Sequence, residues 1–228
     1  MAEVRLYQFV TSPFCAKVRK ILDYKGVDYE LAEVDYLDRR ALLAASKQLM
    51  VPALTFADGE TVSDSDRIAQ RLEEFYPDPA IFPLEFRGIH LALARYFDTE
   101  LEDALFRAAV PDELAHFRRI GAEYEALWRL IRERRYGAGF CDQMVREHDA
   151  NFARAEALLA PLDESIDGRA FLLGRIGYGD FALYGQLSYL AFTGELKIPA
   201  RLAKLRAFYE RMDRISAIIE EEQPGSGE

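Results

Sequence analysis

SPFCAKVR, residues 12–19, is the stretch that decides the fold, because it joins a predicted strand to a predicted helix. The preceding residues 3–10, EVRLYQFV, are largely apolar at both alternating sets of positions, which is typical of a strand covered on both faces. Pro13 suits the first turn of a helix, where its missing N–H would have no partner. Apolar side chains over residues 15–25 then recur on one helical face. The stretch therefore places Ser12 at a helix N-terminus, directly after a buried strand.

The rest of the first 76 residues continues this alternation of strand and helix. Residues 27–34 alternate like a strand, so the first unit is β-α-β and favours parallel pairing with a right-handed crossover. Residues 57–60, Ala-Asp-Gly-Glu, are a good hairpin turn because Asp-Gly tolerates positive φ. The other expected elements are a helix at 39–47, strands at 51–56 and 61–62, and a helix that opens at 63–66. The predicted order is therefore β-α-β-α-β-β-α.

The strand signals stop at a proline-containing linker over residues 76–83. Helical periodicity dominates from there, with expected helices at 91–105, 114–135, 142–162, 180–192 and 199–219, and a loop at 132–139. An α/β module followed by helices fits two packed layers with one seam between them. We expect domains at residues 1–78 and 86–220, followed by a flexible acidic tail at 221–228.

The composition indicates a globular protein with an acidic surface. Half of the 228 residues are hydrophobic, and 29 basic against 39 acidic residues give a net charge of −10. Such a chain lacks the basic face of a nucleic-acid-binding protein. No signal peptide or membrane-spanning run is apparent. The two distant cysteines form no disulfide framework, and the three histidines show no ligand spacing. We therefore expect a cytoplasmic protein with no metal, membrane or nucleic-acid partner.

Ser12 stands where a helix N-terminus offers free N–H groups and the positive end of the helix dipole. Lowering the pKa of a bound thiol by roughly two units needs about 2.7 kcal/mol. The helix end supplies about 0.3–2 kcal/mol, and a hydrogen bond to a charged group supplies about 1.5–3 kcal/mol. Because neither contribution is comfortably enough alone, a hydroxyl at this position is chemically sensible for holding a thiolate. The alternative is that Ser12 is only an N-cap residue.

Three further segments join this candidate site. Cys15 ends a dithiol-like S-P-F-C pattern, either as a reactive thiol or as a small buried hydrophobe. A cis Val51–Pro52 bond would free the N–H and C=O of Val51 to pair with an extended peptide, whereas a trans bond would be an ordinary strand start. Ser65 can bind a carboxylate and Asp64 an ammonium group, or the pair can simply cap its helix.

Together, and in this order, these segments resemble the N-terminal domain of the cytosolic glutathione transferase superfamily. The resemblance rests on SPFCAKVR at 12–19, VPAL at 51–54 and SDS at 63–65. In the second half, residues 171–182, FLLGRIGYGDFA, look like the family's capping segment before a core helix, with Asp180 at the third helical position. The resemblance spans nearly the whole chain. It implies a thioredoxin-like N-terminal domain followed by an all-helical domain, which is the glutathione transferase fold.

The resemblance also implies the co-substrate, glutathione, and a role for each candidate residue. Val51, beside Pro52, pairs with the tripeptide backbone, and Asp64 with Ser65 holds the γ-glutamyl end. Ser12 activates the sulfur, as in serine-type, zeta-like members, whereas omega-like members carry a cysteine there. Phe14 and Cys15 are the further glutathione-binding positions. A small hydrophobic electrophile as second substrate and a homodimer follow from the same resemblance.

Three functions remain open at this point. The first is conjugation of glutathione to an electrophile, which the serine at position 12 favours. The second is a glutathione-dependent thioltransferase or reductase that uses Cys15. The third is a non-catalytic binding protein, because residues 46–49 read Ser-Lys-Gln-Leu where the family usually has Asn-Pro-x-Gly. We also expect the helix over residues 85–109 to line the cleft over Ser12, and we note that Gly177 stands where the capping segment commonly has Ser or Thr.

Overall fold

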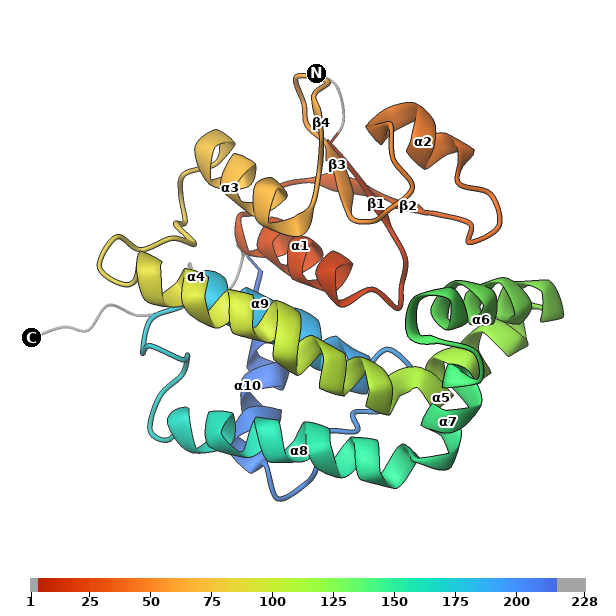
Figure 1. Cartoon of the computed structure of the whole chain (residues 1–228). Coiled ribbons are helices and arrows are strands. Elements are labelled where there is room, and N and C mark those ends of the chain that lie inside the picture. Colours follow the sequence, from red (N-terminus) through yellow and green to blue (C-terminus); the bar gives the residue numbers. More distant parts are fainter. Residues whose placement is uncertain (1–3, 217–228) are drawn as a thin grey trace, which may run out of the picture.

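Four strands form one mixed sheet in the order β2-β1-β3-β4, as seen in the computed structural model, which describes residues 4–216 (Figure 1). The strands are β1 (Val4–Gln8), β2 (Tyr29–Glu33), β3 (Ala53–Thr55) and β4 (Thr61–Ser63). The central strand β1 pairs in parallel with β2 and antiparallel with β3, and β3 pairs antiparallel with β4. The parallel β1–β2 pair and the β3–β4 hairpin are both as the sequence predicts.

Helices cover both faces of this sheet. They are α1 (Pro13–Tyr24), α2 (Arg40–Ser46) and α3 (Ser65–Phe75), so the element order is the predicted β-α-β-α-β-β-α. Side chains of α1 and α3 join Leu6 and Leu54 in the main hydrophobic core. On the opposite face, Leu42 of α2 packs with Tyr7 and Ala53 in a smaller core. Because successive side chains of a strand point to opposite faces, the sheet contributes side chains to two separate hydrophobic cores.

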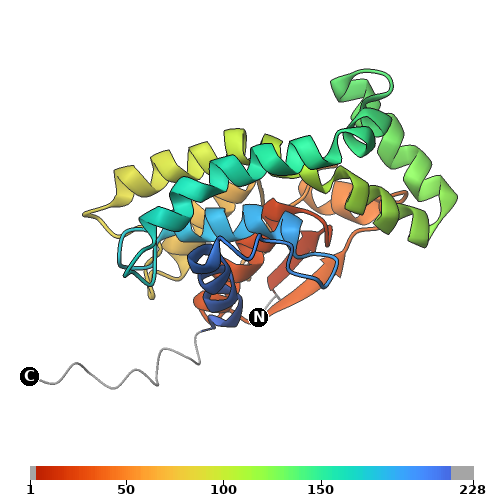
Figure 2. The ribbon, with the colours of Figure 1, turned by 90° about the horizontal axis from the view of Figure 1, so that it is seen from below.

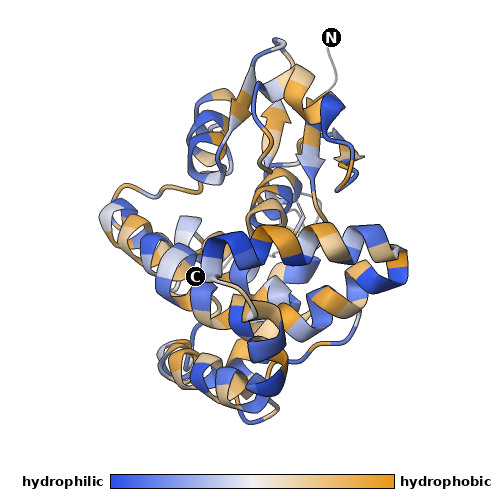
Figure 3. Cartoon of the chain, turned by 45° about the vertical axis from the view of Figure 1, so that its right-hand side comes forward, coloured by the Kyte–Doolittle hydropathy of each residue, from blue (hydrophilic) through white to orange (hydrophobic). Residues whose placement is uncertain are grey.

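The second half is entirely helical. Its helices are α4 (Arg87–Tyr96), α5 (Glu102–Ile120), α6 (Ala122–Tyr136), α7 (Phe140–Arg146), α8 (His148–Ser165), α9 (Tyr178–Leu187) and α10 (Ala203–Arg214). A π-helical segment, Phe97–Leu101, joins α4 to α5 without a break, and a 3-10 turn, Ser188–Leu190, follows α9. Hydrophilic and hydrophobic residues mix along the outer helices (Figure 3), as expected for helices that bury one face. Among residues 4–216, no helix is long and apolar enough to cross a bilayer.

Three expected helix boundaries were wrong. The helix expected over 142–162 is divided at Glu147 into α7 and α8. We expected an interruption between residues 105 and 114, but α5 runs through Pro111 to Ile120. The true break is at Gly121, which lies inside the helix expected over 114–135 and adopts an extended conformation. Buried side chains on both sides of Pro111 anchor α5, so packing outweighs the local penalty of proline. Residues 217–219 of the last expected helix, and the expected tail at 221–228, lie outside the described part of the chain.

Helix α9 is the centre of the molecule, and every one of its residues is buried. It lies between α1 and the surrounding helices (Figures 1 and 2). A Cβ at Gly185 would come within 2.6 Å of the Pro13 carbonyl oxygen, so only glycine lets α9 approach the start of α1 this closely. The same helix thereby supports the N-terminus at which Ser12 stands.

The N-terminus of α9 is capped by Asp180, at the third helical position that the resemblance implied. Its carboxylate accepts hydrogen bonds from the N–H groups of Leu172 and Gly177, both at 2.9 Å. Gly177 lacks a side chain because a Cβ there would lie 2.1 Å from Nε2 of His90. His90 is fully buried, and its Nδ1 accepts the N–H of Gly179 at 3.2 Å. The imidazole therefore occupies the space that a capping Ser or Thr would need.

Replacing Asp180 should destabilise the fold strongly. Asp180→Ala leaves two buried N–H groups without partners, which costs about 2–6 kcal/mol at roughly 1–3 kcal/mol for each group. Asp180→Asn keeps one acceptor oxygen and should lose less. Urea unfolding of both variants measures the loss, with Asp149→Ala, an exposed acidic residue in the first turn of α8, as the control. An Asp180→Ala variant as stable as the control would contradict the capping role.

Candidate functional site

Strand pairing brings the sequence-predicted segments to one edge of the sheet. Tyr7 of β1 lies opposite Ala53 of β3, and Ala53 lies opposite Ser63 of β4. The loop that follows β1, the turn that precedes β3 and the turn that follows β4 therefore meet at this edge. They carry the candidate residues Ser12, Phe14, Cys15, Val51, Pro52, Asp64 and Ser65.

Ser12 is the N-cap residue of α1, with an extended backbone and a half-buried side chain. Its Oγ accepts the N–H of Cys15 at 3.3 Å, and its own N–H donates to the Phe9 carbonyl oxygen at 3.0 Å. Ser12 therefore does cap the helix. The capping hydrogen bond uses only a lone pair of Oγ, so it does not prevent the hydroxyl from donating its hydrogen to an anion placed before the helix.

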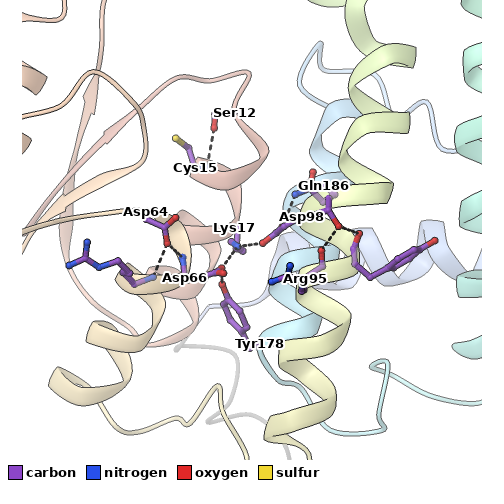
Figure 4. Close-up of polar contacts among 12 residues, drawn as sticks. Ser12, Cys15, Lys17, Asp64, Asp66, Arg95, Asp98, Tyr178 and Gln186 are labelled. Carbon is purple, nitrogen blue, oxygen red and sulfur yellow. Dashed lines mark hydrogen bonds and ion pairs between the residues drawn. The ribbon is translucent and has the colours of Figure 1, made fainter. Parts of the chain in front are cut away.

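Cys15 lies directly beneath Ser12 and is completely buried (Figure 4). Burial raises the pKa of its thiol to about 12, although the Ser12 hydroxyl and the Phe9 backbone both oppose the rise. A thiol with such a pKa is protonated at neutral pH and is a poor nucleophile. Of the two interpretations of Cys15, the geometry favours the small buried hydrophobe.

The Val51–Pro52 peptide bond is cis, and Pro52 is buried while Val51 is half-buried. Within residues 4–216, neither the N–H nor the C=O of Val51 has a hydrogen-bond partner. Both groups lie two residues before the first residue of β3, at the edge that holds Ser12. They are therefore placed to pair with an extended ligand backbone, as an added strand would.

Asp64 and Ser65 form the start of α3. The Asp64 carboxylate caps the helix by accepting the N–H groups of Asp66 and Arg67, at 3.0 and 3.1 Å. Asp64 has a φ of 80°, which is rare for a residue with a side chain and costs of order 1–3 kcal/mol. Such strained backbone clusters at ligand-binding positions. Ser65 is buried at the first helical position, where free N–H groups favour a carboxylate.

A buried lysine, which no local sequence signal marks as part of the site, connects this site to the helical half (Figure 4). Lys17 of α1 is 1% exposed, and its Nζ lies 3.0 Å from Asp66 and 2.6 Å from Asp98. The hydroxyl of Tyr178 also donates to Asp66, and the Gln186 amide donates to Asp98 at 2.8 Å. The network thus ties α1, α3, α9 and the π-helical segment to one another, next to the Asp64 turn.

The two carboxylates of this network respond differently to it. Burial opposes ionisation of Asp66, but the charge of Lys17 and the hydrogen bond from Tyr178 outweigh it and lower the pKa. Asp98 is more deeply buried, and burial raises its pKa even though Lys17 and Gln186 oppose the rise. One ammonium group is thus shared by two acids that are unequally solvated. Asp98 depends most on Lys17, because it has the least access to water.

A cavity of about 440 Å³ opens beside Ser12, between the two halves of the chain. It is lined by Phe9, Val10, Thr11, Glu33, Val34, Asp35, Tyr36, His116, Phe117, Ile120 and Tyr124. The second half contributes the end of α5 and the start of α6, not the segment 85–109 that we expected. Phe97, Leu105 and Phe106 of that region are buried in the core. No local motif marks the true lining, because its members are scattered over more than a hundred positions.

Removing the buried ammonium should destabilise the seam between the halves. Lys17→Met leaves Asp98 buried without its counterion, which costs about 3–5 kcal/mol by analogy with other broken buried pairs. Lys197→Met is the matched control, because its pair with Asp112 is partly exposed, and about 1 kcal/mol or less is expected there. Thermal or urea unfolding measures both losses. Equal losses of stability in the two variants would contradict the conclusion that the buried Lys17 pairs stabilise the seam more than a partly exposed pair does.

Comparisons with known proteins agree with this architecture. A family model described as "Glutathione S-transferase, N-terminal domain" matches residues 6–80. A probable glutathione S-transferase of Solanum tuberosum is 27% identical over 199 residues, which cover 86% of this chain and 77% of the relative. The crystal structure of a glutathione S-transferase from Rhodospirillum rubrum F11 is similar with a TM-score of 0.69 and 25% identity, over 98% of this chain and 94% of that one.

A structure of rice GST1 in complex with glutathione has a TM-score of 0.64 and 23% identity, over 96% of this chain and 91% of that one, and shares the fold. The match at residues 6–80 covers the sheet edge described above. The chain is therefore similar to glutathione S-transferases: its residues 6–80 match their N-terminal domain, and its fold is that of a solved member over nearly the whole chain.

Proposed function

We propose that this protein is a glutathione S-transferase that conjugates glutathione to a small electrophile. In the reaction, the sulfur forms a bond to an electrophilic carbon and the thiol proton passes to solvent. The electron pair of the broken bond leaves with a leaving group or moves onto a conjugated acceptor. The observation that carries the proposal is the meeting of three ligand-binding turns at the sheet edge where Ser12 begins α1. The glutathione-bound rice relative supports the choice of co-substrate.

Each turn has a proposed part in holding the tripeptide. The N–H and C=O of Val51, which have no partner among the described residues, pair with the glutathione backbone. Asp64 accepts the ammonium of the γ-glutamyl end, and the Ser65 hydroxyl and N–H bind its carboxylate. Phe14 is half-buried at the start of α1 and borders the sulfur position, with Cys15 beneath it.

Ser12 is the proposed activating residue, which makes the protein a serine-type member with zeta- and omega-like features. A thiolate before α1 is stabilised by the helix end and by the Ser12 hydroxyl together, because neither alone supplies the free energy needed. A thioltransferase that uses Cys15 is less consistent with the structure, since the thiol is buried and protonated.

Substituting Ser12 tests this assignment. Ser12→Ala removes the hydrogen bond to the thiolate and should lower kcat about 10- to 100-fold, the equivalent of roughly 1.5–3 kcal/mol. Glutathione affinity, measured by calorimetry, should change much less. The pH at which the rate rises should move upward, because the bound thiol then ionises with more difficulty.

Two controls accompany this measurement. Cys15→Ala should retain conjugation, and Ser12→Thr should retain both the hydroxyl and the cap. Wild-type turnover by Ser12→Ala with several electrophiles would rule out the role of Ser12. Loss of activity in Cys15→Ala alone would favour the thioltransferase, and absence of glutathione binding in the wild type would favour a non-catalytic binding protein.

The proposed setting is the cytoplasm, and the proposed assembly is a homodimer, as the family resemblance implies. Large apolar side chains are exposed on both halves, including Met50 at 66% and Leu130 at 52%. Sedimentation should give twice the mass of the chain at micromolar concentration. Met50→Glu should shift the species toward the monomer if that residue lies at the interface, and a wild type that sediments as a monomer would refute the dimer.

A further inference from the structure

Resting on the proposed function, we propose that Gln48 and Arg39 are positioning residues that hold Val51 in place for the glutathione backbone. They act without touching the ligand, because they fix the two peptide units that precede Val51 in the loop between α2 and β3 (Figure 1). The inference gives a role to residues 46–49, Ser-Lys-Gln-Leu, whose departure from the family pattern favoured a non-catalytic binding protein.

The side-chain amide of Gln48 is bonded to both backbone groups of Met50. Its Nε2 donates to the Met50 carbonyl oxygen at 2.7 Å, and its Oε1 accepts the Met50 N–H at 3.0 Å. Only this orientation of the amide satisfies both partners, because a backbone N–H needs an acceptor and a carbonyl oxygen needs a donor. The amide therefore bridges two consecutive peptide units, Leu49–Met50 and Met50–Val51.

The second of these peptide units carries the N–H of Val51. The Met50–Val51 bond is trans, and a trans peptide unit is planar, with its C=O and N–H on opposite sides. The hydrogen bond from Gln48 that fixes the Met50 C=O therefore also fixes the direction of the Val51 N–H. Because Gln48 occupies the opposite side of the plane, the Val51 N–H is left without a partner among residues 4–216.

Arg39 holds the first peptide unit. Its Nη1 donates to the Leu49 carbonyl oxygen at 3.1 Å, while the N–H of the same unit is bonded to Gln48. Side chains thus engage both polar groups of the Leu49–Met50 unit. Arg39 stands directly before the first residue of α2, so it ties the far end of the loop to the start of that helix.

The Arg39 guanidinium is itself held by the first half of the site. Its Cζ lies 5.0 Å from the centroid of the Phe9 ring and 4.6 Å from that of Tyr36, and its Nε donates to the Tyr36 carbonyl oxygen at 3.3 Å. A guanidinium over aromatic faces is attracted by their negative charge. The Phe9 carbonyl oxygen in turn accepts the N–H of Ser12 at 3.0 Å. Arg39 therefore connects the segment that positions the Ser12 hydroxyl to the loop that positions Val51.

The same contacts explain why neither side chain is assigned to the ligand. Both ends of the Gln48 amide are occupied by Met50, and Arg39 already uses two of its nitrogens and its flat face. A guanidinium has further N–H groups, however, so the competing role for Arg39 is to bind the terminal carboxylate of glutathione directly. The two roles predict different responses when that carboxylate is blocked.

Gln48→Ala tests the amide bridge. It frees the Met50–Val51 unit to rotate, so the Kd of glutathione, measured by calorimetry, should rise about fivefold, as expected for one lost hydrogen bond. Because ground-state and transition-state binding weaken together, kcat at saturating glutathione should stay within about twofold of the wild type. Gln48→Glu, which cannot donate to the Met50 carbonyl oxygen, should weaken binding as much. Gln143→Ala on α7, which removes an exposed amide bonded to Glu147, is the matched control. An unchanged Kd, or a loss confined to kcat, would overturn the role of Gln48.

Arg39→Met is tested with two ligands, glutathione and its glycyl monoethyl ester, in which the terminal carboxylate is blocked. A positioning role predicts that the Kd rises by the same factor for both, about fivefold. A rise for glutathione alone would show that Arg39 binds the carboxylate, and it would overturn the positioning role, as would two unchanged values. Arg107→Met in the helical half is the matched control, since Arg107 also lies over two aromatic rings.

The double variant Gln48→Ala/Arg39→Met tests whether the two residues act on one peptide unit. Its loss of glutathione affinity should be smaller than the product of the two single losses, because either change alone already releases the Leu49–Met50 unit. Losses that multiply fully would show that the two side chains act independently and would overturn the shared mechanism.

Amide hydrogen exchange keeps this inference distinct from the proposed function. The Met50 N–H is bonded to Gln48, so in Gln48→Ala it should exchange several times faster with no glutathione present. If the wild type binds glutathione but conjugates nothing, the proposed function fails, and the Kd values still decide the roles of Gln48 and Arg39. If it binds no glutathione, the assignment of Val51 fails together with the proposed function. Faster exchange at Met50 without any change in glutathione affinity would refute the positioning role alone.

Discussion

An ammonium group buried between two carboxylates is the interaction on which the arrangement of this molecule depends. Lys17 projects from α1, the helix that lies between the sheet and α9, and it has almost no contact with water. Leaving such a charge unpaired would cost several kcal/mol, so α3 and the helical half must each supply their acid. The Nζ atom of Lys17 thereby fixes the positions of α1, α3 and the π-helical segment relative to one another. Asp64 lies two residues before Asp66, so the same contacts help to hold its backbone at the unusual positive φ.

The replacement of a thiol by a hydroxyl at the start of α1 changes the chemistry open to the fold. A serine cannot form a mixed disulfide, so Ser12, the first residue of the S-P-F-C pattern, is restricted to hydrogen bonding. The remaining thiol, on Cys15, is completely buried. The same helix N-terminus that favours a protein thiolate can favour a ligand thiolate, since the dipole and free N–H groups act on any anion placed there.

Local signals were enough to predict the first half of the chain. Strand alternation, Pro13, the Asp-Gly turn and short polar residues before α3 each act within a few residues, so the element order and the sheet edge followed from them. In the helical half, local signals misled at Pro111, where packing holds α5 together, and at Gly121, where the true break lies. Lys17 could not be identified as buried, because its cover comes from helices far along the chain.

The contact between His90 and Gly177 couples the substitutions that the two positions accept. The imidazole fills the volume that a side chain at residue 177 would need, so the two positions cannot both carry bulk. A side chain at residue 177 therefore requires the His90 ring to move or to be replaced by a smaller group, and each residue restricts which substitutions the other accepts.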